Sequence, residues 1–140
     1  MGNRIQRFED FIAWQKAREL TKMIYQTTSD SGFSRDWALR DQMRRAAVSI
    51  MANIAEGFER GRPGEFKQYL SMSKASCAEL RSHLYVALDA GHIDRKAWTA
   101  LMSTADEAAR IIGALRVSVE RRLSNPSPIT HHPSPARQGS

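Results

Sequence analysis

Residues 46–58 read AAVSIMANIAEGF, and this segment decides how the chain folds. Its apolar residues recur at steps of three and four, which is typical of a helix, and only Ser49, Asn53 and Glu56 have polar side chains. A helix that is apolar around most of its circumference is usually buried on more than one side. We therefore predict that it packs against its own chain on one side and against a second copy on the other.

Four residues are predicted to lie at the interface between copies. Val48, Met51 and Ala55 are apolar but lie off the main stripe of this helix, and Trp14 lies off the stripe of the preceding one. Closed symmetry is the usual way to bury such a face. The alternative is one deeply buried helix in a lone bundle, with Trp14 partly exposed.

Asn53 and Glu56 lie within the apolar segment, where a buried amide or carboxylate is costly unless it has a partner. We predict a structural role for both residues, with Arg45 or Arg60 as the partner. The alternative is that they belong to a functional site.

The same helical spacing continues on both sides of this segment, interrupted by Gly, Pro and Ser. Helices are predicted over residues 8–28, 36–59, 65–90 and 95–122. Ser34 or Asp36 could cap the second helix, and Asp94 could cap the fourth. No segment alternates with a period of two, so no sheet is expected. The fold class predicted is all-α, an antiparallel up-down-up-down four-helix bundle.

The chain of 140 residues fits one domain. Residues 1–7 are predicted to be a flexible N-terminus, residues 8–123 the bundle, and residues 124–140 a disordered tail rich in Pro and Ser. The lone Cys77 cannot form an internal disulfide, and we identify neither a signal peptide nor a membrane span. We expect a cytoplasmic protein that has no contact with a membrane.

The formal net charge of +6 favours polyanionic partners, chiefly nucleic acid. Eight arginines are candidate contacts because each could neutralise a phosphate and release counterions. They are Arg44, Arg45, Arg60, Arg62, Arg110, Arg116, Arg121 and Arg122. The alternative is a solvated surface, in which Arg121 and Arg122 would complement the dipole at a helix C-terminus.

Several stretches of the chain resemble a known family. Residues 8–17, FEDFIAWQKA, match the pattern FEDLxVWQKA, and residues 42–58, QMRRAAVSIMANIAEGF, match QLRRAAVSIPANIAEGF. Residues 65–70 and 78–80 fit a third helix, so that the likeness covers about residues 8–118. These patterns are those of the bacterial four helix bundle proteins, also called the rRNA intervening-sequence protein family, which the chain resembles.

The resemblance implies a cytosolic bundle that assembles into a homo-oligomeric ring, a homopentamer, with no established enzymatic activity. A related branch, the accessory variability proteins of diversity-generating retroelements, forms basic pentameric barrels, binds nucleic acid and partners a reverse transcriptase. The partners implied are further copies of this chain and RNA or a reverse transcriptase-type nucleoprotein. Met51 departs from the family pattern, which has Pro there, so the kink that Pro would cause is expected to be weaker.

No catalytic, cofactor, metal or small-molecule site is predicted. Glu79 and His83 are four residues apart, whereas di-metal bundles use Glu-x-x-His, and Cys77 falls on the core-facing stripe of its helix. We predict a non-enzymatic oligomeric scaffold that binds structured RNA or a nucleoprotein. The alternatives are a protein-interaction scaffold without a nucleic-acid role and a bundle enzyme that binds a metal or a small molecule.

Overall fold

The computed structural model describes residues 4–33 and 35–124. Over these residues it contains four α-helices and two short 3-10 turns, and no strand. The elements are η1 (Phe8–Asp10), α1 (Ile12–Thr28), η2 (Ser31–Phe33), α2 (Trp37–Glu59), α3 (Pro63–Asp89) and α4 (Arg95–Ser124). The predicted all-α class is confirmed for this part of the chain.

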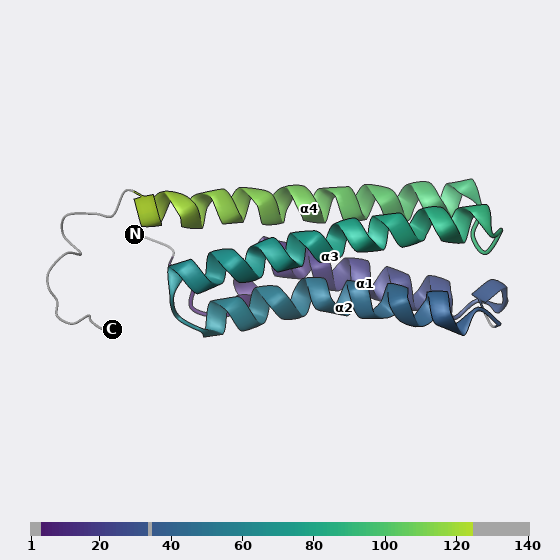
Figure 1. Cartoon of the computed structure of the whole chain (residues 1–140), viewed down its shortest axis with the longest axis horizontal. Coiled ribbons are helices and arrows are strands. Elements are labelled where there is room, and N and C mark those ends of the chain that lie inside the picture. Colours follow the sequence, from purple (N-terminus) through teal and green to yellow (C-terminus); the bar gives the residue numbers. More distant parts are fainter. Residues whose placement is uncertain (1–3, 34, 125–140) are drawn as a thin grey trace, which may run out of the picture.

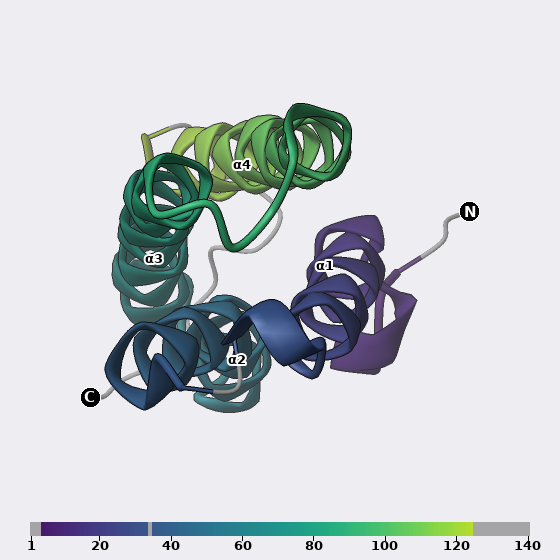
Figure 2. The same ribbon diagram turned by 90° about the vertical axis from the view of Figure 1, so that its right-hand side faces the viewer.

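The four helices lie side by side around one core (Figure 1). Seen along the bundle, α2 packs between α1 and α3, and α4 closes the ring of contacts against α3 and α1 (Figure 2). The connections between successive helices alternate between the two ends of the bundle (Figure 1). Each helix supplies fully buried side chains to the core, for example Leu20, Met43, Leu80 and Ile112. The apolar stripes predicted from the helical period form this core.

Two of the predicted N-caps are present. The carboxylate of Asp36 accepts a hydrogen bond from Leu39 N–H at the start of α2 (3.2 Å), and that of Asp94 accepts one from Ala97 N–H at the start of α4 (2.8 Å). Gly91 follows α3 with a φ of 78°, a conformation that favours glycine and commonly ends a helix.

Some helix boundaries differ from the prediction. The backbone of Phe11 is extended, so α1 begins at Ile12 and residues 8–10 form a separate turn. Pro63, predicted to separate two helices, is the first residue of α3, because its fixed φ suits that position and its missing N–H has no helical partner to lose. Helix α4 reaches Ser124, one residue beyond the predicted end of the bundle. Ser124 was predicted to begin the disordered tail (residues 124–140) but is the last residue of α4. The rest of that tail, residues 125–140, and residues 1–3 of the predicted flexible N-terminus (residues 1–7) lie outside the described residues.

One end of the bundle is held by contacts between its loops. His92 Nε2 lies 2.8 Å from the Asp36 carboxylate, and the His92 ring packs on the buried Phe33 ring, with centroids 4.9 Å apart. The hydrogen bond with His92, and then that from Leu39 N–H, hold the pKa of Asp36 below its ordinary value. These contacts fix the α3–α4 connection against the start of α2.

Candidate nucleic-acid interface

A groove of about 570 Å³ lies between α3 and α4, and we call it the basic groove. Its lining residues are Lys74, Arg81, Asp106, Ala109, Arg110 and Gly113. Arg81 Nε lies 3.6 Å from the Asp106 carboxylate, whereas Lys74 and Arg110 form no ion pair with any residue that the structure describes. The three cations therefore outweigh the single carboxylate, and the groove has a net positive charge.

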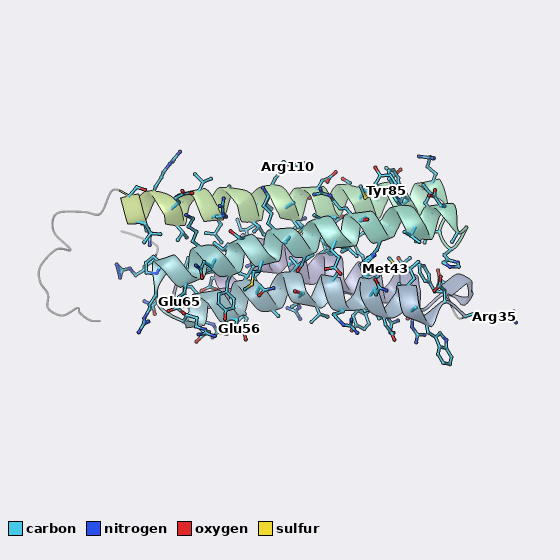
Figure 3. All side chains as sticks on the ribbon, viewed as in Figure 1. Arg35, Met43, Glu56, Glu65, Tyr85 and Arg110 are labelled. Carbon is cyan, nitrogen blue, oxygen red and sulfur yellow. The ribbon has the colours of Figure 1, made fainter. Side chains whose placement is uncertain are left out.

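Helical geometry places these cations along one side of the bundle. Lys67, Lys74 and Arg81 are seven residues apart on α3, which is about 10.5 Å per step along the axis. Across the groove, a Cβ added at Gly113 of α4 would lie 3.5 Å from Lys74 Nζ. The Lys74 ammonium thus lies next to Gly113 of α4, and the exposed Arg110, labelled in Figure 3, lines the same groove.

The remaining cations between α3 and α4 have polar partners. Arg116 Nε donates a hydrogen bond to Ser71 Oγ (2.7 Å), and Lys67 Nζ lies 3.5 Å from the Glu120 carboxylate. Arg116 has a neutral partner, so the positive charge without an anionic partner lies at Lys74, Arg110 and Arg116, of which only Lys74 and Arg110 line the basic groove. Of the four arginines predicted on the fourth helix, only Arg110 lines the basic groove.

The structure places Arg44 and Arg45 on α2, outside the lining of the basic groove. Arg44 Nε donates a hydrogen bond to Thr28 Oγ1 (2.8 Å), and its guanidinium lies 4.4 Å from the centroid of the Tyr25 ring. Arg44 therefore joins α2 to α1. Arg45 is exposed.

Two of the predicted arginines meet at one end of the bundle. Arg62, before α3, and Arg122, in the last turn of α4, line a pocket of about 270 Å³ together with Arg4. We call it the end pocket; Glu65, labelled in Figure 3, marks this end of the molecule. Nothing in the sequence pattern joins these two residues, since they are 60 positions apart.

The neighbouring arginines contribute less to the end pocket. Arg60 Nη2 donates a hydrogen bond to the Tyr69 hydroxyl (2.7 Å), and Arg60 Nη1 lies 3.5 Å from the Glu65 carboxylate. Arg121 is exposed in the last turn of α4 and does not line the pocket. The eight predicted arginines are thus spread over separate surfaces.

The residues predicted for an interface between copies differ in exposure. Val48 is 41% exposed on α2, whereas Met51 and Ala55 are half-buried. Trp14 is also half-buried, and its ring stands edge-on to that of Phe8 with centroids 5.3 Å apart. Val48 is therefore the only one of the four that is exposed, and the interface stays a prediction.

Asn53, on α2, does not form a hydrogen bond with either of the expected arginines. Its side-chain amide donates to Ser49 O (2.8 Å) and Ser49 Oγ (3.0 Å), and Ser49 Oγ is 2.9 Å from Ser76 Oγ on α3. The arginine partner predicted for Asn53 is therefore wrong, because the carbonyl and the hydroxyl of Ser49, one turn earlier on α2, accept both hydrogen bonds of the amide.

Glu56 is exposed, and the structure gives it neither Arg45 nor Arg60 as a partner (Figure 3). Arg60 pairs with Glu65 instead. The expectation of a buried and partnered Glu56 is wrong because position 56 faces solvent, although most of its neighbours in sequence are apolar.

Within the described residues, no group of three or more His, Cys, Asp or Glu side chains is placed to hold a metal ion. Nor does any helix in that part of the chain combine the length and apolarity that crossing a membrane requires. Cys77 is fully buried in the core. Its burial raises the pKa of the thiol to about 11, although the charges of Arg81 and Lys74 act in the opposite direction.

We expect the Cys77 thiol to resist alkylation and disulfide exchange while the protein is folded. At pH 8 roughly one thiol in a thousand would be ionised, and that thiolate is reached only when the core opens. Labelling with a chromogenic disulfide should be at least about a hundred times slower in buffer than in denaturant. Because the chain has a single cysteine, equal rates in the two solvents would mean that the thiol is accessible in the folded protein.

Comparisons with known proteins agree with this fold. The family model described as the 23S rRNA-intervening sequence protein matches residues 9–114. A crystal structure of a protein of unknown function from the S23 ribosomal protein family of Bacteroides thetaiotaomicron VPI-5482 is similar, with a TM-score of 0.68 and 18% identity. The similarity covers 75% of this chain and 98% of that one, and at this identity it supports the fold alone. None of the curated proteins matches the chain.

Proposed function

Because the chain belongs to the family of 23S rRNA-intervening sequence proteins, we propose that it is a cytoplasmic, non-enzymatic scaffold that assembles with copies of itself and binds structured RNA. The proposed assembly is a ring of antiparallel up-down-up-down bundles. Five copies is the size that the sequence resemblance implies. The observation that carries the RNA-binding proposal is the excess of positive charge in the basic groove.

The basic groove suits a phosphate backbone better than the edges of bases. Lys74 and Arg110 have no carboxylate partner among the described residues, so each can neutralise a phosphate without first breaking an ion pair. Lys67 and Arg81 lie seven residues on either side of Lys74 on α3 but pair with Glu120 and Asp106, so Lys74 carries the unpaired charge of this row. Such a surface binds RNA through its shape and phosphates, with little dependence on base sequence.

Self-association would repeat the basic groove once in each copy. Several weak phosphate contacts then act together, and the apparent affinity rises without any new kind of contact. The outward side of α2 supports assembly, because the partly exposed Val48 lies one turn from the small, exposed Ala52. Small side chains allow the helices of two copies to approach closely.

Replacing Arg110 or Lys74 by Ala should weaken binding to an RNA hairpin and make it less sensitive to salt. For each phosphate that the protein no longer neutralises, the slope of log affinity against log salt should fall by about 0.7 to 0.9. Fluorescence anisotropy between roughly 50 and 200 mM salt would measure this change.

Arg45→Ala is the matched control for this titration, because Arg45 is exposed on α2 and does not line the basic groove. It should leave the slope unchanged. Wild-type binding that is independent of salt, absence of binding at any salt, or an equal effect of Arg45→Ala would each contradict the proposal.

A further inference from the structure

The interior of the end pocket is aromatic and apolar. The rings of Phe11, Phe58 and Phe66 form a mutual cluster, with centroids 5.1 to 5.8 Å apart, and all three residues line the pocket. Leu115 and Val119 of α4 line it from another helix. Aromatic rings favour stacked or edge-on contact with another flat ring, so this interior suits a planar group.

The edge of the end pocket is cationic. Arg4, Arg62 and Arg122 come from the N-terminal segment, the α2–α3 connection and the last turn of α4. The Glu65 carboxylate lies 3.2 Å from Arg62 and also pairs with Arg60, so one negative charge is divided between two arginines. Glu65 itself does not line the pocket. The three guanidinium groups thus retain a positive excess, which matches the charge of a phosphate monoester.

The start of α3 adds to the attraction for an anion. Pro63, the first residue of α3, also lines the end pocket. The first N–H groups of a helix have no partner within it, and the aligned peptide dipoles favour negative charge at that end. Arg62 directly precedes Pro63, so this arginine and the start of α3 belong to the same part of the lining, whereas the C-terminal ends of α2 and α4, which also line the pocket, contribute the opposite dipole.

We propose that the end pocket binds a nucleoside monophosphate, with the base against the phenylalanine cluster and the phosphate on Arg62 and Arg122. A fully apolar ligand would leave the guanidinium groups unused, and a small inorganic anion would leave the aromatic interior unfilled. A nucleotide satisfies both parts. This binding does not depend on RNA binding along the basic groove, which is lined by different residues.

Calorimetric titration of the full chain with AMP, adenosine and ribose 5-phosphate tests the proposal. AMP should bind at least about tenfold more tightly than adenosine, which lacks the phosphate, and than ribose 5-phosphate, which lacks the base. If either fragment binds as tightly as AMP, or AMP does not bind, the proposal is overturned.

Arg122→Ala and Arg121→Ala form a matched pair for this titration. Both residues are exposed in the last turn of α4, but only Arg122 lines the end pocket. Arg122→Ala should weaken AMP binding by about fivefold or more, whereas Arg121→Ala should leave it unchanged. Equal losses in the two variants would mean that general surface charge holds the nucleotide, which would overturn the assignment to the pocket.

Discussion

Gly57→Ala is expected to lower the free energy of unfolding by about 1–3 kcal/mol, although alanine is the better helix former. A Cβ added at Gly57 of α2 would overlap the Cβ of Tyr69 on α3 and come within 3.1 Å of Phe66 Cδ1. The overlap is with an atom next to the backbone, so a change of rotamer cannot relieve it. The two helices would have to move apart at this contact, and the core around them would pack less densely.

Gly113→Ala is the control, because Gly113 is also a glycine inside a long helix. A Cβ there would lie 3.5 Å from Lys74 Nζ, the mobile tip of a side chain, and would meet nothing closer. This variant should raise the free energy of unfolding by up to about 1 kcal/mol through helix propensity alone. Urea denaturation should therefore give shifts of opposite sign, and a stabilised Gly57→Ala would contradict the close packing of α2 on α3.

The helical core could be predicted from the sequence because its signal is local. Residues such as Ile50 and Leu80 recur at the helical period, and that period alone selects the buried face. Pro63 was misplaced for a related reason, since proline both ends one helix and suits the first turn of the next. Sequence separates these two roles poorly when the connection is short.

The candidate site was less predictable because it depends on residues that meet across helices. The basic groove joins Lys74 to Arg110, and the end pocket joins Arg62 to Arg122, through packing that no sequence pattern specifies. Lys74 and Arg81 were missed, although a seven-residue spacing from Lys67 was a usable signal for one helix face. The positions of the arginines along the chain do not show which of them lie together in space.

Glu56 was predicted to be buried because its neighbours in the sequence are apolar, and this local signal was misleading. The apolar residues around it suggested burial, yet a helix with several apolar sides can still present one position to solvent. The same geometry leaves Val48 with 41% of its surface exposed. Val48, more than the polar residues near it, is therefore the position at which to test whether this side of α2 contacts a second copy.

Val48→Glu is expected to separate the proposed assembly into single subunits at micromolar concentration. A carboxylate there would be buried between copies without a partner, and an unpaired buried charge is strongly unfavourable. We expect association to weaken by at least about a hundredfold, which corresponds to roughly 3 kcal/mol. Light scattering after size-exclusion chromatography measures the mass of the species directly, and circular dichroism would show whether the helices are retained.

Val117→Glu is the matched control, because Val117 is 43% exposed on α4 and Val48 is 41% exposed on α2. Both substitutions place the same charge on a helix surface of nearly the same exposure, so any general effect on solubility or helix stability should be shared. Only Val48→Glu should change the mass. A wild-type protein that is already a single subunit at micromolar concentration would contradict assembly itself, whereas equal dissociation by both variants would mean that α2 is not the distinctive contact. The two outcomes separate the existence of the assembly from the helix that forms it.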